Sequence, residues 1–262
     1  MCRFLLSFLF LFVVVTGGSA VRPFRTESFY GNVRTLQVRL SGDPLAPPVA
    51  LLGHDEGIVI SFDMLADDPE YLYYRIVHCN ADWTPSDLSD VEYIDGFNGL
   101  PVDDYSFNTY RNYVHYRIAL PNEEVRFRLS GNYAVLVYPE GNPDSLLLTA
   151  CFSITENLVA LGCEITTRTD VDYNKAHQQL SFKVMYPRYE IRNPREELKV
   201  SITTNVGYDD GVTVSQPLYV RNQELEYAHT PRLVFPAGNE YRRFETVSRH
   251  YNTIGVESMR YF

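Results

Sequence analysis

The sequence has 262 residues, of which 45% are hydrophobic, 21% charged and 14% aromatic. This is a globular composition, and it excludes disordered, collagen-like and multi-span membrane proteins. The 23 Lys and Arg residues against 33 Asp and Glu give a formal net charge of −10. Nucleic-acid binding is therefore not expected, because it relies on basic side chains that neutralise phosphates. The 20 Tyr and 15 Phe residues favour β structure and protein contacts.

The N-terminus has the organisation of a secretory signal peptide. A short start with Arg3 precedes an apolar run over residues 4–15, and the small-residue triplet Gly18-Ser19-Ala20 follows. The apolar run is shorter than the roughly 20 residues that span a bilayer, although an N-terminal membrane anchor is the alternative. We therefore expect a signal peptide over residues 1–20, cleavage after Ala20 and export of the mature chain.

Three cysteines remain after cleavage: Cys79, Cys151 and Cys163. An odd number cannot pair completely within one chain, although export permits disulfides. Cys151 and Cys163 could bridge a domain junction, whereas Cys79 lies in an apolar strand and is expected to be a small buried side chain. No C-x-x-C spacing supports a zinc or thioredoxin-like site.

Alternation of apolar and polar residues dominates the first half of the mature chain. Short alternating stretches bounded by Gly, Pro, Asn or Asp are typical of an all-β sandwich, which we assign to residues 21–156. The predicted strands are residues 33–40, 57–64, 71–78, 113–120, 125–129, 133–138 and 146–154.

One corner of this domain is more specific than the strand count. Gly131-Asn132 precedes Tyr133, which opens an apolar strand. Immunoglobulin-like sandwiches place a Tyr here and bond its hydroxyl to the backbone a few residues upstream. We predict that role for Tyr133, with ligand stacking as the alternative.

A second β series follows the junction at residues 156–158, and we assign residues 157–262 to a second sandwich. Residues 187–197 read as a long connection, and residues 254–262 end inside an apolar stretch. We therefore expect tandem immunoglobulin-like domains, the second incomplete, with less than about a tenth of the chain helical. The predicted strands are residues 163–168, 179–186, 198–203, 213–220, 225–229 and 232–235.

Enzyme motifs are missing from the sequence. It has no G-x-S-x-G, H-E-x-x-H, Walker A or G-x-G-x-x-G motif, and its six His residues lack the spacing of metal ligands. The pairs Asp67-Asp68 and Asp103-Asp104 read as solvated turns, and the residues 170–174 lack the Gly and Glu of a calcium loop. We predict no catalytic residue, no metal site and no cofactor.

The most distinctive segment is the polar and aromatic run over residues 78–98. A loop of this length between sandwich strands is functional or is packed by its own side chains. Residues 85–88 could begin a short helix with Ser86 as its cap. The single Trp is an exposed anchor or a plug at one end of the sandwich. The candidate partner-binding residues are Asp82, Trp83, Tyr93, Asp95, Gly96, Phe97 and Asn98.

Several motifs in this region resemble one protein family in register. They are residues 74–83, 85–88, 92–97, 105–109, 115–116 and 130–133, with residues 238–245 resembling the family's second domain. The family is that of the plug proteins of the bacterial type IX secretion system. The resemblance implies a non-enzymatic periplasmic protein at the inner face of the outer membrane, which docks on the translocon barrel and closes its periplasmic opening.

Two other functions stay open at this point. A secreted carbohydrate-binding module would use Trp83, Tyr93 and Phe97 as a stacking platform. A glycoside hydrolase would need paired carboxylates about 5–10 Å apart in a cleft, which the sequence alone does not test.

Overall fold

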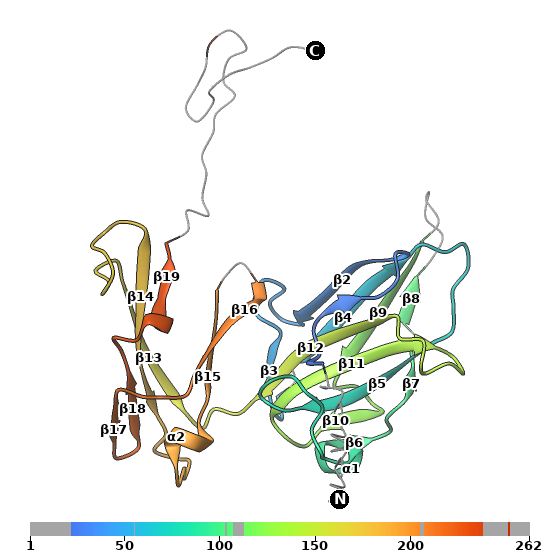
Figure 1. Cartoon of the computed structure of the whole chain (residues 1–262). Helices are drawn as coiled ribbons and strands as arrows, with labels where there is room; N and C mark the ends of the chain where they lie inside the picture. Colours follow the sequence, from blue (N-terminus) through green and yellow to red (C-terminus); the bar gives the residue numbers. More distant parts are fainter. Residues whose placement is uncertain are drawn as a thin grey trace, which may run out of the picture. The chain divides into compact units, whose positions relative to one another are not determined.

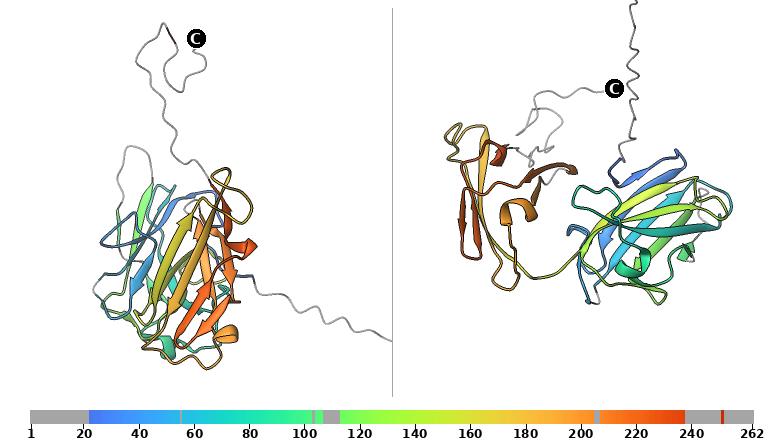
Figure 2. Two further views of the ribbon diagram at one scale, coloured as in Figure 1. Left: turned by 90° about the vertical axis from the view of Figure 1, so that its left-hand side faces the viewer. Right: turned by 60° about the horizontal axis from the view of Figure 1, so that its bottom comes forward.

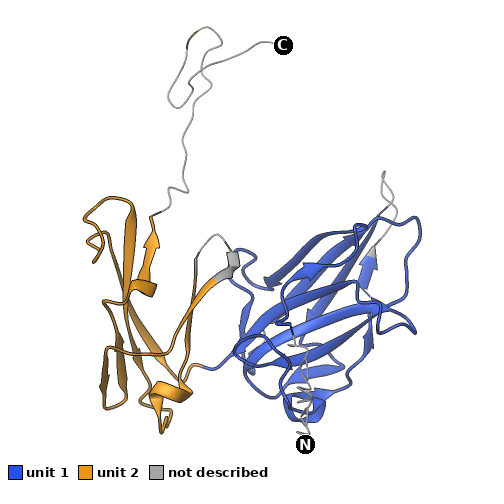
Figure 3. Ribbon diagram, viewed as in Figure 1, with its two compact units in different colours: residues 1–156 blue, residues 157–262 orange. Residues whose placement is uncertain are grey.

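The structure is a computed structural model that describes residues 22–237, except 55, 103, 107–112, 205 and 206, together with residue 251. The chain divides into two compact units, residues 1–156 and residues 157–262 (Figure 3). The predicted signal peptide and residues 238–245 and 254–262 lie outside the described residues.

The first unit contains two larger antiparallel sheets and one small ribbon. One sheet has the order β1-β12-β11-β5-β7, and β3 also pairs with β12, in parallel, farther along that strand than β1. The other sheet has the order β2-β4-β9-β8. The ribbon pairs β6 with β10. Figures 1 and 2 show the two larger sheets as separate layers of this unit. The strands are β1 (Glu27–Ser28), β2 (Val33–Leu40), β3 (Val49–Leu51), β4 (Ile58–Met64), β5 (Leu72–Cys79), β6 (Ile94–Gly96), β7 (Leu100–Pro101), β8 (Asp104–Ser106), β9 (Val114–Leu120), β10 (Val125–Phe127), β11 (Gly131–Pro139) and β12 (Leu148–Thr155).

Both layers contribute to one hydrophobic core. Ile60 and Phe62 on β4 are fully buried, as are Ile76 on β5 and Val135 on β11. These residues come from the alternating stretches of the sequence, in which every second side chain turns to the same face of the sheet. All seven strands predicted for this unit are present, with ends shifted by at most two residues.

The corner before β11 confirms the predicted role of Tyr133. Its hydroxyl donates a hydrogen bond to the Leu129 carbonyl oxygen over 2.7 Å, and its ring is fully buried. The ring lies edge-on to Phe127 at 4.8 Å and stacks on Phe152 at 5.8 Å between centroids. Burial raises the pKa of Tyr133, so its hydroxyl remains a donor at neutral pH.

The second unit has one larger sheet of order β13-β14-β18-β17, with β19 also beside β14, and a separate pair β15-β16. Its core includes Phe182 and Val184 from β14, Leu225 from β18 and Val214 from β16. The strands are β13 (Ala160–Thr166), β14 (His177–Met185), β15 (Val200–Thr204), β16 (Gly207–Val214), β17 (Tyr219–Arg221), β18 (Glu224–Tyr227) and β19 (Val234–Pro236).

One predicted strand of this unit is wrong. Residues 213–220 belong to two strands, because β16 ends at Val214 and β17 begins at Tyr219. Pro217 lies between them and has no backbone N–H to donate to a sheet. Residues 207–212 are also missed, since Gly and Asp are depleted in strands and mask the β pattern there.

Helices are few and short in the described part of the chain. They are α1 (Asp90–Tyr93), α2 (Pro194–Glu197) and the 3-10 turn η1 (Pro231–Leu233). The chain is therefore mostly β, as predicted. Within the described residues, no helix is long and apolar enough to cross a membrane.

The three cysteines among the described residues are free thiols, so the suggested disulfide between Cys151 and Cys163 is not formed in this structure. Cys79 is buried on β5, as predicted, and burial raises the pKa of its thiol to about 12. Cys163 is exposed on β13.

Candidate docking surface

The loop that carries Trp83 is a tight reversal at the end of β5. The Trp83 N–H donates to the Asn80 carbonyl oxygen over 3.0 Å, and the Asn80 N–H donates to the Thr84 carbonyl oxygen over 2.8 Å. The Asp82 carboxylate fixes the turn by accepting bonds from the Thr84 N–H (3.1 Å) and hydroxyl (2.6 Å). The loop thus has a defined conformation built from its own groups.

Trp83 occupies the one position of this loop that favours glycine. Its φ is +65°, in the left-handed region, which is an outlier for a bulky residue and costs about 1–3 kcal/mol. Its side chain is half-buried, so it neither fills the core completely nor extends fully into solvent. A strained aromatic residue on an ordered loop is a candidate for a functional role.

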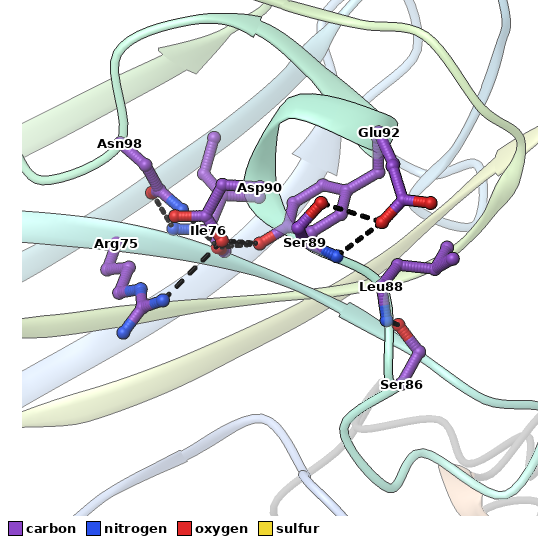
Figure 4. Close-up of polar contacts among 9 residues, drawn as sticks. Arg75, Ile76, Ser86, Leu88, Ser89, Asp90, Glu92 and Asn98 are labelled. Atoms are coloured by element: carbon purple, nitrogen blue, oxygen red, sulfur yellow. Dashed lines mark hydrogen bonds and ion pairs between the residues drawn. The ribbon is translucent and has the colours of Figure 1, made fainter.

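The chain from Ser86 to Glu92 shows where the short helix begins (Figure 4). The predicted cap Ser86 is wrong: the N-cap is Ser89, and α1 begins at Asp90. The Ser89 N–H and hydroxyl each donate to Glu92 Oε2 over 2.7 Å. This is a capping box, which needs Glu or Gln three residues after the cap, and Ser86 has Ser89 at that position. These hydrogen bonds from Ser89 lower the pKa of Glu92.

Tyr93 is not on the surface, contrary to its predicted place in a contact site. Its side chain is only 2% exposed and belongs to the core. Its hydroxyl lies 2.6 Å from Asp90 Oδ1 and 3.0 Å from the Ile76 carbonyl oxygen, both of which are acceptors. Burial and this contact with Asp90 raise the pKa of Tyr93. A stacking platform of Trp83, Tyr93 and Phe97 is therefore not formed.

The Asn98 side chain is bound to the backbone of strand β5 and is not available for contact with a partner. Its side-chain oxygen accepts from the Ile76 N–H over 2.7 Å, and its side-chain nitrogen donates to the Ile76 carbonyl oxygen over 2.8 Å. Tyr93 and Asn98 thereby converge on one backbone unit of β5, and Figure 4 shows Asn98, Asp90 and Arg75 around it.

Asp90 holds this cluster together electrostatically. Desolvation alone would raise its pKa, but hydrogen bonds from Tyr93 and Asn98 and the charge of Arg75 lower the pKa overall. Arg75 Nη2 lies 3.4 Å from Asp90 Oδ1. The negative charge on Asp90 is therefore favoured in the folded protein.

The segment from Asp95 to Phe97 places one aromatic ring in solvent. Gly96 has φ +114°, and a Cβ there would lie 1.9 Å from the Glu124 carbonyl oxygen, so only glycine fits. Arg128 Nη2 binds Asp95 Oδ1 at 3.2 Å, and the Phe97 N–H donates to Glu124 over 3.2 Å. The Phe97 side chain is 71% exposed. The backbone on both sides of Phe97 is thus fixed while its ring is free to make contacts.

Apart from the exposed Gly96, which has no side chain, the candidate residues with accessible side chains and no role in the core or the sheet are Asp82, Trp83, Asp95 and Phe97. Trp83 follows β5 and Phe97 follows β6, so the two rings lie on separate loops. The chain around them is strongly acidic: residues 79–98 contain no Lys or Arg. Their acidic members are Asp82, Asp87, Asp90, Glu92 and Asp95. We call the accessible four residues the docking segment.

Ser86 and His78 form a hydrogen-bonded pair at the end of β5. The Ser86 hydroxyl lies 2.9 Å from His78 Nδ1. On the other side of the ring, Nε2 faces Gly131, where a Cβ would approach it to 2.4 Å, so a side chain at position 131 would clash with the ring. Burial lowers the pKa of His78. In the described residues, no three His, Cys, Asp or Glu side chains are grouped to hold a metal ion.

Comparison with known proteins relates the first unit to one protein family. The family model described as type 9 secretion system plug protein 1st domain matches residues 33–156. The first unit of this chain is therefore similar to the first domain of the type 9 secretion system plug proteins. The match covers both sheets of the first unit from β2 onward and the whole docking segment.

A solved structure is similar to this chain over most of its length. The crystal structure of a hypothetical protein from Parabacteroides merdae ATCC 43184 has a TM-score of 0.81 and 40% identity over 92% of this chain. This chain spans 61% of the length of that relative.

Another solved structure is an alkylpurine DNA glycosylase from Pseudomonas fluorescens bound to DNA with an abasic site analogue. It is 16% identical and covers 47% of this chain and 30% of its own, and its TM-score of 0.28 carries no argument. No curated protein matches the sequence.

Proposed function

We propose that this chain is a type 9 secretion system plug protein and acts as a non-enzymatic gate of that system. It docks on the outer-membrane translocon barrel from the periplasmic side and closes the barrel's opening when no substrate is in transit. The observation that carries this proposal is the family match over residues 33–156. The predicted signal peptide supports a periplasmic location at the inner face of the outer membrane.

The docking segment is the surface that we assign to this contact. Phe97 combines a fixed backbone with a ring that is largely in solvent. Protein interfaces concentrate their binding energy in a few such aromatic anchors, surrounded by polar residues. The five acidic residues of this stretch outnumber the two basic side chains that pair with it, Arg75 and Arg128, and this excess favours a partner surface that carries Arg or Lys.

We further assign the first unit to the immunoglobulin-like sandwiches. Such domains order their strands A-B-E-D in one sheet and G-F-C in the other. The order β2-β4-β9-β8 fits the first sheet, and β12-β11-β5 fits the second, with the same sequence of strands along the chain. The bond from Tyr133 to Leu129, at the start of the strand that corresponds to F, supports this assignment.

A non-enzymatic role agrees with the described site. The His78 ring of the Ser86 and His78 pair lies close against Gly131. We expect the purified protein to hold no stoichiometric metal or cofactor and to hydrolyse neither glycosides nor esters.

The proposal is tested by affinity capture from detergent-solubilised outer membranes of the source organism. We expect the tagged mature chain to recover a large β-barrel protein, identified by mass spectrometry. A matched chain with Trp83→Ala and Phe97→Ala should recover less of it. Recovery of no barrel protein by the folded wild-type chain would refute docking, whereas equal recovery by both chains would move the contact to another surface.

A further inference from the structure

The segment before β1 is bound to the loop that carries Trp83. The Phe24 N–H donates a hydrogen bond to the Trp83 carbonyl oxygen over 2.9 Å, and the Phe24 side chain is half-buried. Segments near a chain end are poorly ordered unless contacts tie them down, and this contact reaches far along the sequence. We call residues 24–26 the strap.

The strap has a second attachment on β12. The Thr26 hydroxyl accepts a hydrogen bond from the Cys151 N–H over 3.0 Å. Directly after it, β1 pairs Glu27 with Thr149 on the same strand. The Thr26 side chain therefore extends the pairing of β1 along β12 by one more backbone group, which fixes the strap where it leaves the sheet.

The two attachments lie on different parts of the sheet. β12 and β5 are not neighbours, because β11 lies between them, and Trp83 lies in the loop that follows β5. The strap therefore joins two elements that the sheet itself separates by one strand. The Trp83 carbonyl cannot move away from the sheet unless one of the two strap hydrogen bonds breaks.

The sheet holds the start of the same loop through side chains. Asn132 Nδ2 on β11 donates to the Asn80 carbonyl oxygen over 3.2 Å, and the Ser153 hydroxyl on β12 donates to Asn132 Oδ1 over 2.8 Å. The Trp83 N–H donates to the same Asn80 carbonyl oxygen. The sheet thus fixes the loop at Asn80, and the strap fixes it at the carbonyl of Trp83.

The strap acts at the residue of this loop with the least favourable backbone. Trp83 has φ +65°, a conformation that a bulky residue keeps only where its surroundings over-determine it. The hydrogen bond from Phe24 supplies one such constraint, on the carbonyl of the strained residue itself. Without it, the Trp83 backbone is freer to return to ordinary φ values, and its ring then changes direction.

We propose that the strap positions Trp83 for docking, with Phe24 and Thr26 as positioning residues. Phe24 holds the Trp83 carbonyl, and Thr26 holds the strap on β12. The inference rests on the proposed docking function, and it adds the segment before β1 to what the docking segment requires. Detachment of the strap frees the Trp83 backbone and weakens the contact made by its ring, while the core of the first unit stays folded.

Two pairs of variants of the mature chain test the strap by hydrogen exchange. Phe24→Pro removes the N–H that binds Trp83, and Phe24→Ala keeps it. Thr26→Val removes the hydroxyl that binds Cys151, and Thr26→Ser keeps it. We expect Phe24→Pro and Thr26→Val to speed exchange over residues 80–84 about five- to tenfold, the factor that one net hydrogen bond contributes. The two conservative variants should exchange like the wild-type chain. Unchanged exchange in both removal variants, or equal effects within each pair, would overturn the strap.

The single Trp of the chain gives a second readout at the same place. Acrylamide quenches the emission of accessible indole rings, so quenching should increase in Phe24→Pro and Thr26→Val and stay at the wild-type level in Phe24→Ala and Thr26→Ser. Exchange over β4 should stay slow in all four variants, which separates release of the loop from unfolding of the core. Unchanged quenching in both removal variants would contradict a positioning role for the strap.

Binding to the purified translocon barrel tests positioning for docking. We expect Phe24→Pro to raise the dissociation constant about five- to tenfold and Phe24→Ala to leave it unchanged. Faster exchange of the loop with an unchanged dissociation constant would overturn the positioning role. If the wild-type chain does not bind the barrel, the docking function fails and the role in docking fails with it, whereas the exchange measurement still confirms or overturns the attachment of Trp83.

Discussion

The side-chain amide of Asn98 pairs with both backbone groups of Ile76, its oxygen accepting from the N–H and its nitrogen donating to the carbonyl. Strand β7 pairs with β5 only at Tyr73 and Tyr74. The Asn98 side chain therefore extends the hydrogen bonding of β7 along β5. It pairs the Ile76 N–H, which would otherwise be an unpaired group at the edge of the sheet, and it shares the Ile76 carbonyl with the Tyr93 hydroxyl.

Replacing Asn98 tests this role. Asn98→Ala leaves the Ile76 N–H without its acceptor and leaves the Ile76 carbonyl with only the Tyr93 hydroxyl, so we expect the free energy of unfolding to fall by about 1–3 kcal/mol. Urea unfolding of the mature chain measures it. The exposed Asn142 in the turn after β11 gives the control Asn142→Ala, which should change the free energy by less than about 0.5 kcal/mol. Equal effects of the two variants would contradict the assigned role.

Gly96 and Gly141 form a matched pair for the close approach at the docking segment. Both have positive φ, but a Cβ at Gly96 meets the Glu124 carbonyl oxygen, whereas a Cβ at Gly141 meets nothing within 4 Å. We expect Gly141→Ala to cost about 1–2 kcal/mol of stability from its backbone conformation alone. Gly96→Ala should cost clearly more in the same unfolding experiment. A smaller loss of stability for Gly96→Ala than for Gly141→Ala would mean that the backbone around residue 96 moves to accept the Cβ without loss of stability.

The lowered pKa of Asp90 predicts a pH dependence of stability. A carboxyl whose pKa is lower in the folded state stabilises that state above its ordinary pKa of 3.8, and the contribution is lost as pH falls through the lowered value. Asp90→Asn should therefore lower the free energy of unfolding at pH 7. The difference between the variant and the wild-type chain should become smaller as pH falls from about 5 to 3. Unfolding at a series of pH values measures this, with Asp87→Asn as the exposed control. A difference in free energy of unfolding that does not change with pH would contradict this prediction.

Much of the first unit was predictable because its pattern is local. The alternation in β4 and β9 follows from burial of one face, and the Gly131-Asn132-Tyr133 corner is a short-range signal. The strands that sequence reasoning missed there, such as β3 and β7, are three residues or fewer and carry no period.

The candidate site was less predictable because its roles depend on contacts distant in sequence. Tyr93 and Asn98 both bind Ile76, which lies 17 and 22 residues before them, and no local pattern distinguishes these from exposed contact residues. The helix start was readable, since Ser89 and Glu92 have capping-box spacing. The exposed ring of Phe97 directly follows the Gly96 turn, and both residues were among the candidates named from the sequence.

Trp83→Gly distinguishes the effect of backbone strain at this position from the contribution of the Trp83 side chain. Glycine adopts φ +65° freely, so the change removes the strain while deleting the side chain. If the ring serves docking, the free energy of unfolding should change by less than about 1 kcal/mol. A loss of about 3–5 kcal/mol would instead identify Trp83 as a core plug. Trp83→Ala, which keeps the strained backbone, is the control.

The dissociation constant between the mature chain and the purified translocon barrel tests the central claim most directly. We predict that Phe97→Ala weakens binding by about 2 kcal/mol, roughly thirtyfold, with an unchanged thermal midpoint. Tyr71→Ala is the matched control, since Tyr71 is also an exposed aromatic residue, 76% exposed, outside the docking segment. It should leave the dissociation constant unchanged. Equal affinity of the Phe97→Ala and wild-type chains, or no binding by either, would contradict the account.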